Sequence, residues 1–393
     1  MRRILPFCLL VCLPLAAQQA PIPAATALSG DPFFIKKTWP IGGSGNWDYL
    51  TLDVQAQRLY IAHGHAVQVV DVASGSLAGE IAGFREARAV ALDATGVDGY
   101  VSDWAANTVT VFNRATLKAE ASIPIGCSPR FLAFEPQSKL VFALCGPNPA
   151  SARPGQRQAP PETYGLSLIV IIDAARRAVA ADIALDGDFR VAQPDGSGSI
   201  YATAAKPGWI AKFDAAGIAA EAQRKSGSGA VHFDWSHHRQ PPGLVQSIAL
   251  HASCQEPQGL AVDGKDLRLF VACENQTLQV LNADHGEIVA SLVTGPGDDV
   301  IGYDADRGLI YSANGGGYGS LTIVRQDANT DSYAVVQTLP TMAQARTLAV
   351  DPSTGEVYLV TDVRGVDLTK PGGIGTLRSV PIQGSFQVIV VGR

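Results

Sequence analysis

Several features that would define a helical fold or a serine enzyme are missing from this chain. It has no long stretch with the apolar period of a helix, so we expect few helices. It also has no G-x-S-x-G motif, the strand-turn-helix elbow that carries a nucleophilic serine. The 30 basic residues are outnumbered by 36 acidic ones. Because nucleic-acid affinity comes mainly from neutralising phosphates, this balance argues against a general nucleic-acid binder.

An acidic residue followed by an aromatic one recurs seven times along the chain. The aromatic residue comes seven positions after the acidic one, except in one pair that is a residue shorter. The pairs are Asp53/Tyr60, Asp93/Tyr100, Glu135/Phe142, Asp195/Tyr201, Asp263/Phe270, Asp304/Tyr311 and Asp351/Tyr358. Each acidic residue ends a short apolar run and each aromatic residue begins the next, as in a β-hairpin. We interpret the acidic residues as turn residues that bind their own backbone, and the aromatic ones as core.

The spacing of these hairpins predicts the fold. Where nothing is inserted, the aromatic residues recur every 40 to 42 residues, the period of a propeller blade. We therefore expect an all-β fold, a seven-bladed β-propeller with four-stranded blades, as a single domain over residues 31–393. Residues 33–41 are typical of an outermost strand without a blade, and residues 385–391 of a third strand without a fourth. The N-terminal strand should therefore close the last blade and remove its open edge.

Three insertions interrupt the repeat, at residues 146–165, 217–242 and 362–384. We expect them as loops on blades 3, 4 and 7. The first and third should flank the face where the central channel opens, and the second should lie on the opposite face. The second insertion holds a short histidine-rich tract, whose possible metal ligands are His232, Asp234, His237 and His238. Spacing alone leaves open whether this tract binds a metal or is simply solvated.

Residues 1–20 have the pattern of a secretory signal peptide. Arg2 and Arg3 precede an apolar core and small residues, so we expect cleavage near Ala17. Removing the two arginines takes the net charge from −6 to about −8. The apolar stretch is short for a membrane span. We therefore expect a periplasmic or secreted monomer, without a membrane span in the mature chain.

Four cysteines remain after the signal peptide, in two matching pairs. In blades 3 and 5, one cysteine precedes the first strand and the other ends the second strand, so the hairpin brings them to the same end. Export would supply an oxidising compartment. The sequence therefore predicts disulfides Cys127–Cys145 and Cys254–Cys273. Four independent thiols and a four-thiolate metal site spanning two blades are the alternatives.

The hairpins LDVQAQRLYIAHG, LAVDGKDLRLFVACEN and LAVDPSTGEVYLVTD, the strand end VQVVDVASG and the terminal SFQVIVVGR carry a family resemblance. They resemble the YVTN-type repeats of the YncE-like family of exported seven-bladed propellers, over nearly all of residues 31–393. The family is similar in architecture to surface-layer repeats and to the propellers of some quinoprotein dehydrogenases, and a bacterial member has been linked to single-stranded DNA. The resemblance implies the fold, and it transfers no activity, cofactor or catalytic residue.

Five residues before each acidic turn residue, a second column is polar in every repeat. Its members are Asp48, Arg88, Arg130, Arg190, Gln258, Asp299 and Arg346. This position begins the innermost strand of each blade, so we expect a ring of polar side chains at the mouth of the channel. Four arginines could hold a carboxylate or phosphate by bidentate hydrogen bonds. His63, Asp103 and Asn314, at nearby strand ends, could orient such a ligand. Alternatively, the arginines pair with the aspartates and with loop carbonyls as structural spokes.

Three classes of function fit these residues. The first is an exported binding or scaffold protein, whose partner is a small anionic molecule or an envelope protein. The second is a lactonase-type propeller hydrolase with a central calcium, for which the candidate ligands are Asp48, Asp103, Asn314 and Asp299. The third is a passive module of the cell envelope. We favour the first, with no catalytic residue and no cofactor assigned.

Overall fold

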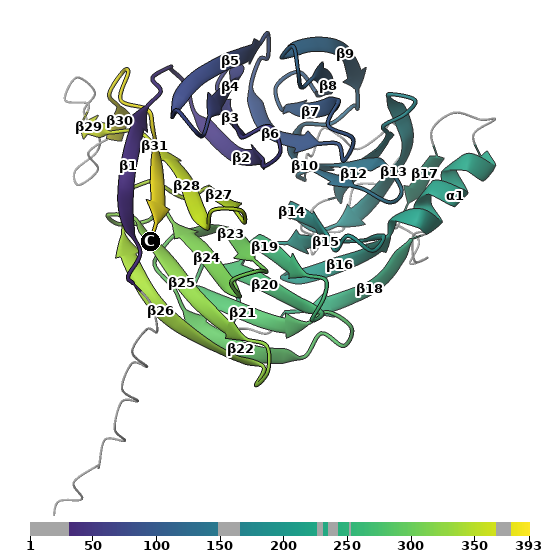
Figure 1. Cartoon of the computed structure of the whole chain (residues 1–393). Helices are drawn as coiled ribbons and strands as arrows, with labels where there is room; N and C mark the ends of the chain where they lie inside the picture. Colours follow the sequence, from purple (N-terminus) through teal and green to yellow (C-terminus); the bar gives the residue numbers. More distant parts are fainter. Residues whose placement is uncertain (1–30, 148–165, 226–230, 235–242, 251–252, 367–378) are drawn as a thin grey trace, which may run out of the picture.

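The computed structural model describes residues 31–147, 166–225, 231–234, 243–250, 253–366 and 379–393. Over these residues the chain forms seven antiparallel sheets arranged in a ring (Figure 1). Six of them have four strands, and the seventh has a fifth strand added to its outer edge. The predicted all-β, seven-bladed propeller is therefore confirmed.

Each blade runs outward from a first strand beside the channel. The strands of blades 1 to 4, from inside to outside, are β2 (Trp47–Asp53), β3 (Arg58–His63), β4 (Ala66–Asp71), β5 (Ser76–Ala82); β6 (Ala87–Leu92), β7 (Asp98–Asp103), β8 (Thr108–Asn113), β9 (Lys118–Pro124); β10 (Pro129–Glu135), β11 (Leu140–Cys145), β12 (Leu166–Asp173), β13 (Ala178–Asp186); and β14 (Phe189–Pro194), β15 (Ser199–Ala204), β16 (Trp209–Asp214), β18 (Leu244–Ala249). Those of blades 5 to 7 are β19 (Pro257–Asp263), β20 (Arg268–Cys273), β21 (Thr277–Asn282), β22 (Ile288–Val293); β23 (Asp298–Asp304), β24 (Leu309–Asn314), β25 (Ser320–Asp327), β26 (Ser332–Pro340); and β27 (Leu348–Asp351), β28 (Glu356–Thr361), β31 (Gln387–Gly392), β1 (Phe34–Pro40).

Blade 7 is built from both ends of the chain, as predicted. Its outermost strand is the N-terminal β1, which pairs antiparallel with the C-terminal β31 from Phe34↔Gly392 to Pro40↔Gln387. Figure 1 shows these two strands side by side at opposite ends of the colour scale. The inner strands contact one another in order around the channel, and β27 contacts β2. The ring is thus closed without a free edge between the first and last blades.

The two repeating columns have the roles predicted for them. Every acidic turn residue accepts a backbone N–H from two to four residues ahead, for example Asp53 from Ala56 at 3.0 Å and Glu135 from Ser138 at 2.6 Å. Every aromatic partner is at most 1% exposed. The repeat therefore encodes a turn and an inter-blade core, and the acidic column forms no cation-binding ring.

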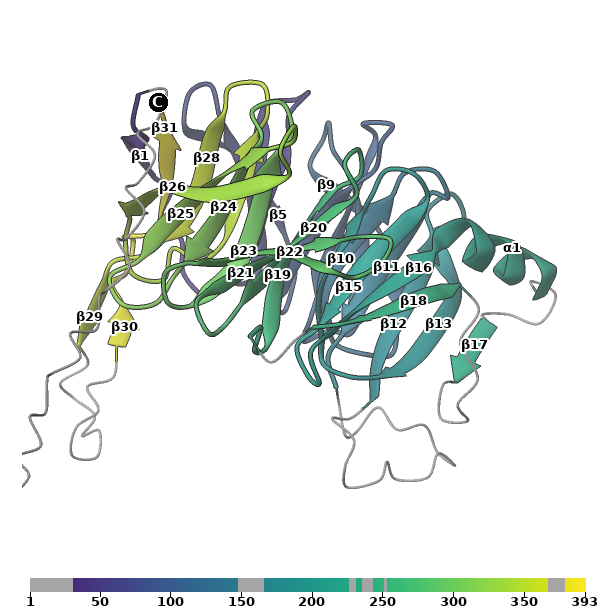
Figure 2. The same cartoon turned by 90° about the horizontal axis from the view of Figure 1, so that it is seen from below.

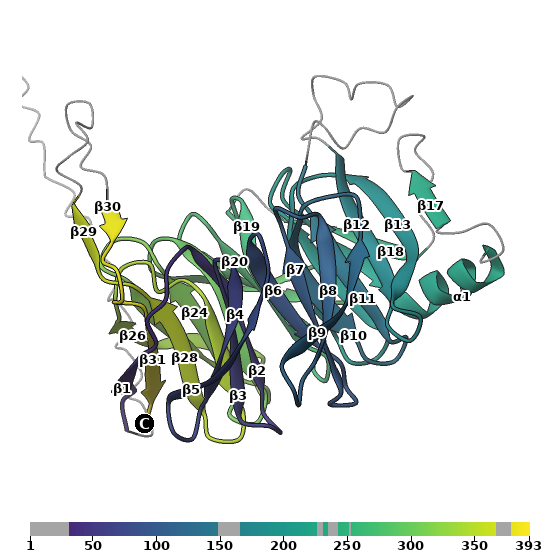
Figure 3. The same cartoon turned by 90° about the horizontal axis from the view of Figure 1, so that it is seen from above.

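The insertion between the third and fourth strands of blade 4 reaches its neighbour. It contains the helix α1 (Ala215–Lys225) and the strand β17 (Val231–Asp234). β17 pairs in parallel with β13, the outermost strand of blade 3. Figure 2 shows α1 and β17 outside the ring. In blade 7, a small ribbon of β29 (Arg364–Val366) and β30 (Ser379–Pro381) projects from one face, as Figures 2 and 3 both show.

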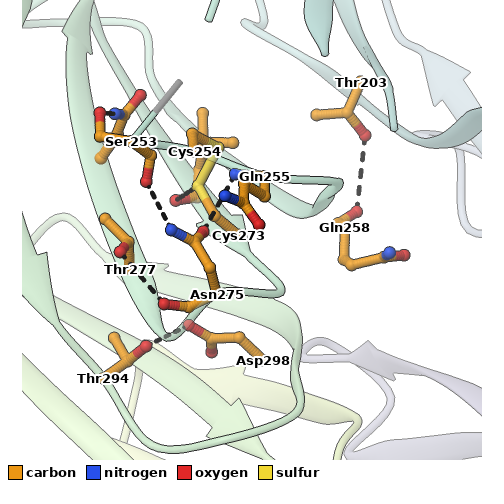
Figure 4. The surroundings of a disulfide bond; sticks show 12 residues. Thr203, Ser253, Cys254, Gln255, Gln258, Cys273, Asn275, Thr277, Thr294 and Asp298 are labelled. Carbon is orange, nitrogen blue, oxygen red and sulfur yellow. Dashed lines mark hydrogen bonds between the residues drawn. A yellow bond between two sulfur atoms is a disulfide. The ribbon is translucent and has the colours of Figure 1, made fainter. Parts of the chain in front are cut away.

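Both predicted disulfides are present. The Cα atoms of Cys127 and Cys145 are 6.0 Å apart, and those of Cys254 and Cys273 are 5.1 Å apart. Figure 4 shows the second bond beside the inner strand of blade 5, where Gln255 N donates to Asn275 Oδ1 at 3.0 Å. Each disulfide ties the start of an inner strand to the end of the second strand. Both therefore stiffen the end of the ring that carries the polar column.

Removing one disulfide should lower stability without changing the fold. Each bond closes a loop of 18 or 19 residues, for which the loss of unfolded-state constraint predicts about 3 kcal/mol. We expect Cys254→Ser/Cys273→Ser to lose this much free energy of unfolding in a denaturant titration under non-reducing conditions. An unchanged midpoint, or peptide mapping that recovers free thiols from the wild-type protein, would contradict the pairing.

A candidate anion site at the mouth of the channel

The polar column enters the channel because of a recurring irregularity in the inner strands. In β2, β6, β10, β14, β19 and β23, the pairing with the second strand shifts register at the column position, as between Trp47 and Leu50 around Asp48. A bulge of this kind redirects a side chain that would otherwise point into a blade interface. In blade 7, Arg346 precedes β27, and its N–H donates to Gln344 O at 2.8 Å. All seven column residues are thereby presented to the axis.

These residues line one cavity of about 560 Å³ at the end of the channel. The volume lies within the range that small-ligand sites occupy. Its lining comprises the whole column, namely Asp48, Arg88, Arg130, Arg190, Gln258, Asp299 and Arg346, together with Tyr49, Trp104, Glu274, Gly297, Asp298, Gly315, Gly316 and Gln344. The structure therefore brings together all of the predicted ring.

Each arginine of the ring is paired with a carboxylate. Arg88 lies 2.9 Å from Asp48 and 2.6 Å from Glu86, and Arg346 Nε lies 3.2 Å from Asp299 Oδ2. The other two arginines, Arg130 and Arg190, share a single acid. The arginines therefore form the ion pairs expected of structural residues, and these pairs limit the positive charge that is left for a ligand.

Arg130 and Arg190 share Asp188. Arg130 Nη1 lies 3.0 Å from Asp188 Oδ1, and Arg190 Nη2 lies 2.6 Å from Asp188 Oδ2. One carboxylate therefore serves two guanidinium groups that belong to neighbouring blades. Both arginine side chains remain about one-third exposed, at 34% and 29%. Among the direct ion pairs of the ring, Arg130 and Arg190 therefore have the fewest carboxylate groups per guanidinium group.

Several guanidinium donors in the cavity have no acceptor. Among the described residues, the buried Nε atoms of Arg88, Arg190 and Arg346 lack a hydrogen-bond partner, and the approach of Arg346 Nε to Asp299 is a close ion pair without hydrogen-bond geometry. An unpaired buried donor costs about 1–3 kcal/mol. These nitrogen atoms are closed to solvent, so a ligand in the cavity would meet the exposed atoms of the same side chains, which are 30%, 29% and 36% exposed.

Burial raises the pKa of the cavity carboxylic acids. The pKa of Asp298 rises to about 7, because burial outweighs the hydrogen bonds that Ser312 and Thr294 donate to it. The pKa of Asp299 rises to about 6, again through burial, which the Arg346 charge opposes. Burial also raises the pKa of Asp48, against the hydrogen bond and charge of Arg88. Near neutral pH the lining therefore carries less negative charge than its carboxyl count suggests, while the arginines stay charged.

Three residues expected to orient a ligand lie outside the cavity. His63, at the end of β3, places Nδ1 2.8 Å from Gln68 Oε1, and its ring centre lies 4.1 Å from that of Phe386, with the two planes tilted by 40°. It lines two smaller hollows near the rim instead. The interpretation of His63 as a ligand-orienting group at the channel mouth therefore finds no support in its position.

The side chains of Asp103 and Asn314 form hydrogen bonds within the protein. Asp103 accepts the N–H groups of Arg85 at 2.7 Å and Glu86 at 3.0 Å, which fixes the connection into β6. Asn314 Nδ2 donates to Thr322 Oγ1 at 3.0 Å inside blade 6, where Asn314 is fully buried. Neither lines the cavity. Of the four candidate calcium ligands, only Asp48 and Asp299 do, so the set proposed for a lactonase centre is not assembled.

The histidine-rich tract is described only in part. His232 and Asp234 belong to β17, whose side chains are not placed, and His237 and His238 lie outside the described residues. Within the described part of the chain, no group of three or more His, Cys, Asp or Glu residues is arranged to hold a metal ion. The metal hypothesis for this tract stays a hypothesis.

The sequence reading missed four chemically important lining residues, although a signal existed. Trp104 and Glu274 each come directly after the second strand of their blade, a position that is glycine in blade 6, Gly315. A Cβ at Gly315 would lie 2.7 Å from Arg346 Cβ, so this blade has no room for a side chain there. Tyr49 and Asp298 flank the column within the bulge. The residues next to the column and the residue after each second strand would together have predicted all four.

Comparisons with known proteins agree on the fold. The sequence matches no known family, and no curated protein matches it. Among solved structures, the chain is similar to one titled Kuenenia stuttgartiensis Hydrazine Synthase, with a TM-score of 0.59 and 16% sequence identity, over 85% of this chain and 96% of that one. At that identity the likeness shows the propeller fold alone. The resemblance to YncE-like, YVTN-type repeats therefore remains a prediction.

Proposed function

We propose that this protein is an exported binding protein that holds a small carboxylate at the mouth of its central channel. The observation that carries the proposal is the convergence of Arg88, Arg130, Arg190 and Arg346 on one cavity, where Arg130 and Arg190 share a single carboxylate. A guanidinium group matches the two oxygens of a carboxylate and gives charge-assisted hydrogen bonds. The propeller fold is consistent with a binding or scaffold role.

The Arg130 and Arg190 pair is the expected anchor for the ligand. These two groups share one carboxylate, so an incoming anion adds a counterion where one is lacking. Arg88, in the blade next to Arg130, is less favourable, because it already contacts two acids. The Arg88 guanidinium carbon also lies 5.2 Å from the centre of the Trp104 ring, a cation–π contact that helps to hold it in place.

Export is the second part of the proposal. Two disulfides are compatible with an extracytoplasmic protein, since such bonds persist in oxidising compartments. Among the described residues, no helix is long and apolar enough to cross a membrane. N-terminal sequencing of the protein recovered from the periplasm or medium should give a chain that starts just after Ala17. A chain beginning at Met1 would contradict export by a cleaved signal.

Binding should strengthen as the pH falls from 8 to 6. With pKa values of about 7 and 6, Asp298 loses most of its negative charge over this interval and Asp299 loses about half, whereas the arginines keep their positive charge. A simple carboxylate ligand stays ionised above about pH 5. The cavity thus becomes more positive while the ligand remains an anion. We expect the dissociation constant of butyrate to fall by up to about tenfold per released charge.

Isothermal titration with butyrate at pH 8, 7 and 6 tests the function and its pH dependence together. Asp298→Asn/Asp299→Asn should bind at pH 8 as the wild-type protein does at pH 6, and should show little further change. No binding of butyrate or inorganic phosphate at millimolar concentration would contradict an anion site. Binding that weakens as the pH falls would contradict the assigned role of the two aspartates.

A further inference from the structure

A second cavity, here the lower cavity, lies further along the channel from the arginine-lined cavity at its mouth, here the upper cavity. It measures about 300 Å³ and is lined by residues of six inner strands, among them Leu50, Val191, Leu260, Val262, Val300 and Val350. None of its lining residues is charged. Protein interiors are packed to crystal density and leave few voids larger than a water molecule. A hollow of this size in the axis of the ring is therefore space that side chains leave unfilled.

Tyr49 lies between the two cavities. Among the described residues it is the one that lines both of them, and its ring meets Phe131 edge-on, with centroids 4.7 Å apart and planes at 81°. The two rings belong to blades 1 and 3, which are not neighbours, so their contact spans the channel. It marks the boundary between a charged upper chamber and an uncharged lower one. Burial, followed by the charges of Asp299 and Asp48, raises the pKa of Tyr49, so its hydroxyl stays protonated and can donate to an anion.

We propose that the ligand is amphiphilic, an unbranched aliphatic carboxylate whose head binds the arginines and whose chain enters the lower cavity past Tyr49 and Phe131. This inference rests on the proposed anion site and specifies its ligand class. The apolar side chains favour burial of methylene groups. The inner strands are also edge strands, with one row of backbone groups unpaired toward the channel. A narrow aliphatic chain on the ligand leaves room for water beside these backbone groups, whereas an aromatic or cyclic ligand would displace that water.

Titration with a series of carboxylates tests the inference on the wild-type protein. For acetate, butyrate, hexanoate and octanoate, each added methylene that reaches the lower cavity should tighten binding about threefold to fourfold. Octanoate should therefore bind on the order of a hundredfold more tightly than butyrate. Equal affinity along the series would overturn the amphiphilic ligand and leave the anion site standing. Absence of binding by every member would overturn the anion site itself.

A variant with the lower cavity filled distinguishes the contribution of the ligand's aliphatic chain to binding from that of its carboxylate. Val262→Phe, with Val350→Phe as a second choice if the first does not fold, should remove the gain from butyrate to octanoate and leave acetate binding unchanged. Val293→Phe is the matched control, because Val293 is 77% exposed on the outermost strand of the same blade. That control should retain the full chain-length dependence. A gain that persists in both filled variants would place the chain elsewhere and overturn the inference.

Discussion

Deleting residues 31–42 should prevent stable folding of the propeller or lower its melting temperature by more than about 10 °C. The deletion removes β1 and with it the whole ladder to β31. It also removes Phe33 and Trp39, which are 3% and 6% exposed. Loss of a buried aromatic side chain costs about 3–5 kcal/mol. Two such losses approach the entire stability of a typical domain, about 5–15 kcal/mol.

The N-terminal segment also connects blade 7 to blade 6. The Gln337 side chain accepts the Phe33 N–H at 2.9 Å and donates to the Phe33 carbonyl at 2.8 Å. The Phe33 ring packs edge-on against Tyr311, with centroids 5.9 Å apart. The contribution of β1 is therefore larger than that of one strand in one sheet. It seals the junction between two blades.

Two adjacent phenylalanines provide the matched control. Phe33→Ala should lose about 3–5 kcal/mol of unfolding free energy, whereas Phe34→Ala should lose less than about 1 kcal/mol. Phe34, the first residue of β1, directly follows Phe33 and is 50% exposed, so the two variants are adjacent in sequence and differ in burial. Denaturant titration of both variants and of the deletion measures the differences. Similar stabilities for the two variants, or an unchanged melting temperature in the deletion, would contradict closure by β1.

Replacing Arg130 and Arg190 together with alanine should weaken butyrate binding by at least about a hundredfold. Each charge-assisted hydrogen bond contributes about 1.5–3 kcal/mol, so two of them account for that factor or more. Both side chains are partly exposed at the cavity wall, where an ion pair such as theirs with Asp188 contributes about 0–1 kcal/mol, so the fold should survive. Titration calorimetry with circular dichroism on the same samples measures both. Wild-type affinity in a folded double variant would contradict the assignment of the anchor.

Three further variants separate the possible causes of that loss. Arg130→Lys/Arg190→Lys keeps the charge and removes the fork, and should bind at an intermediate level. Adding Asp188→Asn to the alanine pair removes the carboxylate that would otherwise stand unpaired, and should not restore binding. Arg176→Ala/Arg224→Ala removes the same charge from side chains that are 59% and 73% exposed outside the cavity, and should bind as the wild-type protein does.

The fold was predictable from the sequence because it repeats. An acidic turn residue followed seven positions later by a buried aromatic residue predicts each hairpin, and seven copies of this pattern predict the ring. The two unpaired strand patterns at the ends of the chain predicted closure between β1 and β31. The cysteine pairs were predictable for the same reason, since Cys127 and Cys145 sit at matching ends of one hairpin. Each of these inferences uses only short-range pattern and the symmetry of the blades.

The part of the site that could not be predicted depends on contacts between blades. Position along a strand predicted which residues face the axis, and all seven of the ring do. Strand position could not show that Asp188 pairs with two arginines, because one of them, Arg130, lies 58 positions away in a neighbouring blade. Nor could it show that His63 hydrogen-bonds with Gln68, or that β17, in the insertion of blade 4, pairs with a strand of blade 3. Such choices are set by packing in three dimensions.

A crystal structure of the mature protein grown with saturating hexanoate tests the central claim most directly. We expect the carboxylate in the upper cavity, within hydrogen-bond distance of the Arg130 and Arg190 guanidinium groups, and the chain directed past Tyr49 toward the lower cavity. Hexanoate bound only at another surface, or a channel mouth without hexanoate at a concentration where titration shows binding, would contradict it.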